Sequence, residues 1–181
     1  MTHLFLFPFL GWAMSQPLPH SEIRFCDEKE FAEIETEFMQ YRGTRLSPET
    51  DPIGYVLECD LSYPPELADY FSQFPPLAEK RVVKKEEYSP HTLALAEKYG
   101  VHSTQTPKLL CDLHPKKKYI LHYRNLQLCL ELGVKLDKIH SAIRFRQSNY
   151  LASYISLNTS HRNNSGDDKF KRDFFKLLNS K

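Results

Sequence analysis

Prolines constrain this chain more than any other feature of its sequence. Twelve prolines stand against six glycines over 181 residues. Because proline fixes its own φ and restricts the residue before it, such a chain bends often and stiffly. Five of the prolines fall within residues 64–90, where we expect a loop with little regular structure.

The composition is that of a folded protein. Hydrophobic residues make up 41% of the chain and charged residues 26%, which is typical of a chain that buries a core. The length allows one core, or a core with an appendage. The four cysteines form no CxxC pair, so we expect a reducing compartment and neither a disulfide scaffold nor a zinc ribbon. No apolar run approaches the ~20 residues that span a membrane, so we expect no membrane partner.

Charge divides the chain into an acidic part and a basic part. Residues 1–114 carry ten Lys and Arg against eighteen Asp and Glu, a formal charge of −8. Residues 115–181 carry fourteen against five, a formal charge of +9. This asymmetry indicates either that the basic part binds a polyanion such as nucleic acid, or that it packs on the acidic part.

Periodic hydrophobic residues predict a mixed α+β fold. Phe31, Ile34 and Phe38 repeat at helical spacing. Asp27 precedes them and is expected to cap the helix. Residues 53–61 alternate as a strand does. Further along, the sequence predicts a short helix over 91–99, a strand over 119–123, a helix over 125–132, a strand over 134–145 and a final helix after the loop at 163–166.

The first residues are unusually apolar. Residues 4–14 form an almost unbroken apolar stretch, which has the length of a signal-peptide core but no Lys or Arg before it. We therefore do not expect secretion, although Asn158 and Asn163 lie in glycosylation sequons. Burial against a larger core explains the stretch equally well. Pro17 and Pro19 then predict a turn or an extended connector.

The final helix separates its cations from its apolar residues. On a helical wheel, Lys169, Arg172 and Lys176 share one stripe. The other stripe is apolar and contains Phe170 and Phe174. We expect the aromatic residues to be buried and to hold the helix while the three cations face outward. A surface helix whose basic face is merely solvated is the simpler alternative.

Two carboxylates are candidates for a metal site. Glu58 and Asp60 are two residues apart, so they lie on one face of a strand. The segment from Asp60 to Pro64 superficially resembles the metal-binding DxxSLYP motif of family B polymerases, with a spacing that is too short. A strand edge with exposed acids is the alternative. The chain has no glycine-rich phosphate loop, which excludes P-loop and dinucleotide folds.

Five longer strings occur in order along nearly the whole chain. They are GWAMSQPLP (11–19), IGYVLECDLSYPPEL (53–67), KKKYILHYRNLQLCLELGVKL (116–136), YISLNTSHR (154–162) and DFFKLLNS (173–180). Together they resemble protein-primed family B DNA polymerases of the organellar and viral type, especially those of the self-synthesising transposons called Mavericks or Polintons. Five long matches in order are far more specific than one short motif.

The resemblance implies roles for residues at both ends of the chain. The aspartate and tyrosine of the family's motif A fall on Phe5 and Leu10, so the first metal ligand is missing. Lys176 matches the motif B lysine that grips the triphosphate, and Asn179 matches the asparagine that follows it. Arg172 lies one helical turn earlier, where the family also has a basic residue. These last three are the expected nucleotide-binding residues.

The resemblance also implies a cofactor and partners. The family uses Mg²⁺, because two ions activate the primer hydroxyl and neutralise the leaving phosphates while carboxylates hold them. Since the matching carboxylates are missing, we expect no specific metal here, with Glu58 and Asp60 as the remaining candidates. The family's partners are DNA, dNTP and a terminal protein. The expected nucleic-acid contacts of this chain are Lys116, Lys117, Lys118, Arg124, Arg162 and Lys169.

The chain is therefore expected to be an α+β fragment of a protein-primed DNA polymerase. Residues 1–52 would be a palm segment with the remnant of motif A and an acidic helix, residues 53–150 the inserted subdomain, and residues 151–181 the start of the fingers helix. We expect a nucleotidyltransferase by family whose isolated chain does not polymerise. The alternatives are a domesticated module that binds nucleic acid or protein, and an unstable product of a mispredicted gene. If expressed, the chain is expected in the nucleus or an organelle.

Overall fold

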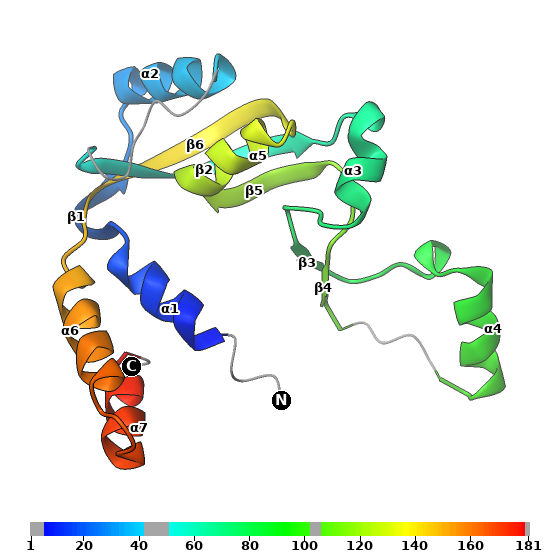
Figure 1. Cartoon of the computed structure of the whole chain (residues 1–181). Helices are drawn as coiled ribbons and strands as arrows, with labels where there is room; N and C mark the ends of the chain where they lie inside the picture. The colour runs from blue at the N-terminus through cyan, green and yellow to red at the C-terminus, as the bar shows by residue number, and fades with distance from the viewer. Residues whose placement is uncertain (1–5, 42–50, 102–105, 180–181) are drawn as a thin grey trace.

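A four-stranded antiparallel sheet is the centre of the fold (Figure 1). The computed structural model describes residues 6–41, 51–101 and 106–179. The strand order is β1-β6-β2-β5, with β1 (Leu18–Phe25), β2 (Ile53–Ser62), β5 (Lys116–His122) and β6 (Lys135–Ser148). Each neighbouring pair is antiparallel. The chain has the mixed α+β architecture that its periodicity predicts.

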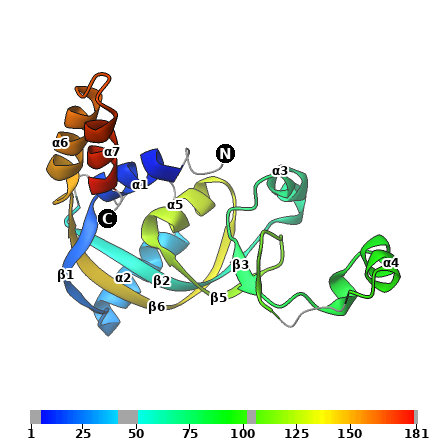
Figure 2. The same cartoon turned by 90° about the horizontal axis from the view of Figure 1, so that it is seen from below.

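Helices surround the sheet unevenly. Those of the described residues are α1 (Leu6–Ser15), α2 (Glu28–Met39), α3 (Ala68–Ser72), α4 (Pro90–Lys98), α5 (Tyr123–Glu131), α6 (Ala152–Asn163) and α7 (Lys169–Leu178), with 3₁₀ turns η1 (Pro65–Leu67) and η2 (Lys85–Glu87). A small second sheet pairs β3 (Glu79–Arg81) with β4 (Lys108–Leu110). In both views α4 lies far from the main sheet, whereas α1, α6 and α7 gather beside its β1 end (Figures 1 and 2). Within the described ranges, no helix is long and apolar enough to cross a membrane.

The alternation of β2 decides which face of the main sheet is buried. Leu57, Cys59 and Leu61 are fully buried, and they share one face because successive side chains of a strand point to opposite sides. Side chains of α2 and α5 complete this core: Ile34, Phe38, Leu126 and Cys129. The Tyr41 hydroxyl, just after α2, donates to the Glu131 carboxylate of α5 at 2.8 Å. Both helices therefore belong to one core with β2.

The helix α2 forms as its sequence predicts. The Asp27 side chain accepts the backbone amide of Glu30 at 2.9 Å, and the Glu30 carboxylate accepts the amide of Asp27 at 3.1 Å. This capping box satisfies amides that the first helical turn leaves without partners. The predicted helices over 91–99 and 125–132 and the predicted strands over 53–61, 119–123 and 134–145 are also confirmed, with bounds that differ by a few residues.

Residues 18–25 form a strand, so the expectation of a turn or connector was wrong there. They pair with the last part of β6, from Ile143 to Ser148. Pro19 is compatible with the strand because β1 is the outermost strand of the sheet, where a missing amide hydrogen is tolerated. The pairing joins segments on both sides of the expected boundary at residue 52, since β6 comes from the 53–150 segment.

Residues 64–90 are more regular than their prolines predict, and the expectation of a loop was wrong. The segment contains η1, α3, β3 and η2. Two of its prolines begin helical turns, Pro65 in η1 and Pro90 in α4, because the fixed φ of proline suits the first helical position. Phe71 of α3 is buried and packs edge-on against Tyr63 with ring centroids 5.1 Å apart.

The sequence did not predict α1 or α6. The apolar stretch at the start of the chain becomes α1, which packs on α6. A Cβ on Gly11 would lie 3.9 Å from Ile155 of α6. Trp12 is nevertheless 59% exposed, so the described part of the stretch is not fully buried in this chain. The sequence of α6 shows no hydrophobic repeat at helical spacing, because one of its two buried residues, Asn158, is polar and only Ile155 is apolar.

A buried lysine links the small β3–β4 sheet to the main sheet. Lys116, the first residue of β5, is fully buried. Its ammonium lies 2.7 Å from Asp112 Oδ1 and 3.4 Å from Glu79 Oε2. Arg81 contacts the other oxygen of Asp112 at 2.8 Å. Burial raises the pKa of Asp112, but the hydrogen bonds from Lys116 and Arg81 outweigh it and hold this pKa well below its usual range.

Lys116→Met should lower the free energy of unfolding by roughly 3 kcal/mol, because it leaves half-buried carboxylates without their ammonium partner. The matched control is Lys117→Met, whose side chain is 67% exposed and whose loss should cost less than about 1 kcal/mol. Urea denaturation measures both variants. Equal losses in the two variants would contradict a structural role for Lys116.

Candidate nucleic-acid interface

On the face of the main sheet opposite the core, charged residues gather at the end of β2 that holds Glu58 and Asp60, whereas Phe145, which pairs with Gly54 nearer the other end, is buried. We call this face the charged face and define it by the side that holds Glu58, Asp60 and Ser62 of β2. Residues paired across neighbouring strands lie on the same face. Lys138 of β6 pairs with Asp60, and Lys135 pairs with Ser62. The charged face therefore brings lysines of β6 beside the carboxylates of β2.

Both neighbours of β2 bulge next to Asp60. On β6, His140 is an extra residue between two successive partners of β2. On β5, the register shifts opposite Asp60, and Lys118 has a φ of 50°, a left-handed conformation that is uncommon for a residue with a side chain. Bulges redirect groups out of the regular ladder. Here the two bulges aim donors at a single carboxylate.

Asp60 accepts from three donors. The backbone amide of Lys118 donates to Oδ1 at 2.8 Å. His140 Nε2 lies 2.8 Å from the same oxygen, and the Lys117 ammonium lies 3.1 Å from Oδ2. The Lys118 amide first, and then His140 and Lys117, hold the pKa of Asp60 well below its usual range. Asp60 is therefore an ionised acceptor that holds the two bulges together.

The two candidate carboxylates do not fit the Mg²⁺ that the family resemblance implies. An ion at Asp60 would have to displace Lys117 and His140. The Glu58 carboxylate instead accepts the Ser141 hydroxyl at 3.2 Å. Across the described ranges, no group of three or more Asp, Glu, His or Cys side chains could hold a metal. The alternative of a strand edge was also wrong, since β2 lies inside the sheet between β6 and β5.

The structure separates the three adjacent lysines that were expected to contact nucleic acid. Lys116 is fully buried among carboxylates, so that expectation was wrong for this residue. Lys117 is exposed but paired with Asp60. Lys118 is exposed, and in the part of the chain that the structure describes its side chain forms no ion pair.

Acids of the first part of the chain neutralise some cations of the second. Glu22 lies 3.4 Å from Arg144 and 3.3 Å from Arg146. Glu30 lies 2.7 Å from Arg24 and 3.6 Å from Arg144. The hydrogen bond from Arg24, with that from the Asp27 amide, lowers the pKa of Glu30 to about 2. For Arg144 and Arg146, the basic part does pack on the acidic part.

Other cations of the basic part remain on the surface. They are exposed and form no ion pair with any residue in the described ranges, and we call them the unpaired cations: Lys118, Lys135, Lys138, Arg162, Lys169 and Arg172. The first three come from β5 and β6, and the last three come from α6 and α7. Part of the formal positive charge of the second half is thus presented to solvent.

The C-terminal helix differs from its expected orientation. Phe170 is 78% exposed and Phe174 is 47% exposed, so the expectation that these aromatic residues are buried was wrong. Lys176 is half-buried. The Asn179 amide donates to the Thr159 hydroxyl of α6 at 3.2 Å. The expected nucleotide-binding residues therefore lie in the α6–α7 pair, and β2 with its carboxylates runs away from that pair toward α3 (Figure 1).

Of the remaining expected residues, Arg124 contacts Gln16, just after α1, and Leu10 belongs to α1. Arg124 is half-buried, and its guanidinium donates to the Gln16 side chain at 3.4 Å. Burial, and then the charge of Arg124, lowers the pKa of His122 to about 4. Leu10 lies in α1 and is 42% exposed. Phe5 lies outside the described residues.

Sequence reasoning missed Lys135, Lys138 and His140. Lys135 and Lys138 lie in a segment that was predicted to be a strand, so strand alternation could have placed at least one of them outward. The bulge at His140 shifts the period within that strand, and nothing in the local sequence marks it.

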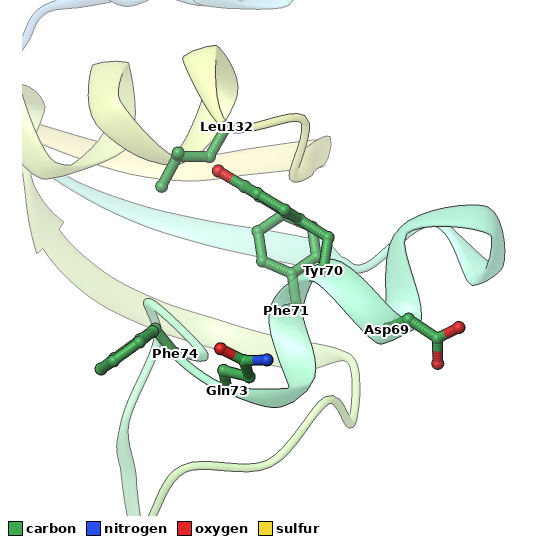
Figure 3. A pocket seen from close by; sticks show the side chains of 6 residues that line it. All are labelled: Asp69, Tyr70, Phe71, Gln73, Phe74 and Leu132. Atoms are coloured by element: carbon green, nitrogen blue, oxygen red, sulfur yellow. The ribbon is translucent and has the colours of Figure 1, made fainter.

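A separate aromatic hollow lies between α3 and the end of α5 (Figure 3). Its volume is about 320 Å³, and Asp69, Tyr70, Phe71, Gln73, Phe74 and Leu132 line it. Phe74 is 84% exposed. Among the described residues, no cation lines this hollow, so it is separate from the unpaired cations.

Comparisons with protein-family models, with curated proteins and with solved structures find no match to this chain.

Replacing Asp60 with Asn should flatten the dependence of stability on pH. The folded-state pKa of Asp60 lies below the unfolded value of ~3.9, so its stabilisation is complete above that value and is lost as the pH falls through the folded pKa. The difference in melting temperature between wild type and Asp60→Asn should be largest near neutral pH and shrink in acid. The control is Asp137→Asn, a carboxylate that accepts the Ser62 hydroxyl at 2.9 Å. The same flattening in both variants would contradict the role of Asp60.

Proposed function

We propose that this chain is part of a protein-primed family B DNA polymerase and that, by itself, it binds nucleic acid without transferring nucleotides. The family assignment depends on five strings that occur in the family's order. The mixed α+β architecture is compatible with it. In the full enzyme, Arg172, Lys176 and Asn179 would contact the triphosphate of a nucleotide.

The unpaired cations carry the proposal of nucleic-acid binding. Cations that serve the fold are already matched by acids, as Lys116 is by Asp112 and Arg144 is by Glu22. The unpaired cations have no such partner in the described ranges and are exposed. Exposed cations that neutralise phosphates release condensed counterions, which supplies most of the sequence-independent affinity for nucleic acid.

The carboxylates support the absence of catalysis. Nucleotidyl transfer needs acidic side chains that hold metal ions. The position that matches the first ligand holds Phe5. Asp60 is occupied by Lys118, His140 and Lys117. The chain therefore keeps exposed cations suited to a polyanion, and its described residues hold no cluster of acids for the reaction.

Reversing the unpaired cations should weaken DNA binding and its salt dependence. One variant changes Lys118, Lys135 and Lys138 to Glu, and another changes Arg162, Lys169 and Arg172 to Glu. Fluorescence anisotropy with labelled DNA over a series of salt concentrations should show lower affinity. The salt slope should fall by about 1 for each phosphate that the variant no longer neutralises.

The matched control reverses three exposed lysines of the acidic part, Lys29, Lys80 and Lys98. This variant changes the net charge by the same amount at other places on the surface. If the control weakens binding as much as the two test variants, the binding depends on net charge and not on the proposed surface. If wild type does not bind DNA, the proposal of nucleic-acid binding fails.

The isolated chain should not extend a primed template in the presence of dNTPs and Mg²⁺. The physical reason is that the described residues hold no cluster of carboxylates for the metal ions. Gel analysis of a labelled primer provides the measurement, with a no-protein sample as the baseline. Templated extension above that baseline would contradict the proposal, and loss of that extension in Asp60→Ala would assign the metal to Asp60.

A further inference from the structure

Two aromatic rings of α7 face solvent. Phe170 is 78% exposed and Phe174 is 47% exposed. Their ring centroids lie 6.4 Å apart, and the ring planes differ by 14°. Side chains four residues apart lie on the same face of a helix. The two rings therefore form a nearly parallel pair on the outside of α7, which we call the aromatic pair.

The packing of α7 on α6 keeps the aromatic pair outside. Phe175 stacks on His161 of α6 with ring centroids 4.9 Å apart, and it contacts the Phe174 ring edge-on with centroids 5.4 Å apart. The Tyr154 hydroxyl of α6 donates to the Leu178 carbonyl of α7 at 3.5 Å. Because these contacts fix how α7 lies on α6, the aromatic pair cannot turn inward without breaking them.

Cations flank the aromatic pair. Lys169 precedes Phe170 and Lys171 follows it, so on the helix the two lysines lie on either side of the ring. Lys169 is exposed, and Lys171 keeps a 65% exposed side chain while it contacts Asp168 at 3.5 Å. Arg172 is exposed as well, but it lies two positions from each ring and therefore on the opposite side of α7, so only the two lysines flank the rings. Exposed rings beside exposed cations match the two parts of a nucleotide, its base and its phosphate.

We infer that the aromatic pair is a stacking platform for the bases of an unpaired nucleic-acid strand, with the flanking cations holding its phosphates. This inference rests on the proposed nucleic-acid binding and names the kind of strand that is bound. Bases of a duplex are stacked on each other and do not offer their faces to a protein ring. Unpaired bases do, and aromatic side chains in a positively charged setting bind them without regard to sequence.

Stacking on the aromatic pair can be distinguished by experiment from binding by charge alone. Phosphates are common to single strands and duplexes, so the unpaired cations by themselves bind both. A contribution from stacking appears only with unpaired bases. Removal of the rings should therefore lower the affinity for a single strand and leave the affinity for a duplex nearly unchanged.

The experiment compares oligothymidylate with a mixed-sequence DNA duplex by fluorescence anisotropy of the full chain. The double variant Phe170→Ala/Phe174→Ala should bind oligothymidylate about tenfold or more weakly, because the bases can no longer stack on the rings. Duplex affinity should change less than about twofold, because the charge is unaltered. Phe170→Leu/Phe174→Leu keeps an apolar surface without rings and should weaken single-strand binding similarly, whereas Phe170→Tyr/Phe174→Tyr should retain it.

The matched control is Phe74→Ala, which removes an 84% exposed ring at the hollow beside α3. It should leave both affinities unchanged. Equal single-strand affinity of wild type and the double alanine variant would overturn the inference while the proposed nucleic-acid binding stands. Retained binding in the leucine variant would show an apolar contact, such as one with a protein partner, and would overturn it too. A wild-type chain that binds neither probe would refute both proposals.

Discussion

The fold depends on one strand, β2, whose apolar side chains are buried in the core on one face and whose acidic side chains need hydrogen-bond donors on the other. Leu57, Cys59 and Leu61 are buried with α2 and α5, while Asp60 faces the opposite side between two neighbouring strands. A carboxylate inside a sheet is costly unless donors reach it. Residues at the bulges of β5 and β6 provide these donors, so irregularities in both neighbouring strands serve one side chain.

Some cations of the chain form ion pairs within the fold, and others are exposed on the surface. Lys116, Arg144 and Arg146 reach acids that come from other segments, and in this way the acidic part neutralises structural cations. The unpaired cations remain on β5, β6 and the α6–α7 pair. A net charge of +1 therefore hides exposed cations that form no ion pair within the described ranges.

Much of the fold could be predicted because local periodicity and capping are properties of neighbouring residues. The capping box of Asp27 and the alternation of residues 53–61 are visible in the sequence and present in the structure. The edge strand β1 and the polar helix α6 could not be predicted, since pairing with β6 and packing beside α1 stabilise them. Four of the unpaired cations, Lys118, Arg162, Lys169 and Arg172, were named from the sequence, while Lys135 and Lys138 were missed.

The sequence by itself determined the α+β alternation, the division of charge and the ordered strings that resemble a polymerase, because each is written in residue types and short spacings. Only the tertiary structure decided that Lys116 is buried while Lys118 is exposed, and that the rings of Phe170 and Phe174 face outward. The physical reason is that burial depends on which distant segment covers a residue. Neighbouring residues of one chain can therefore differ completely, one buried in a core, the next in an ion pair and the next exposed to solvent.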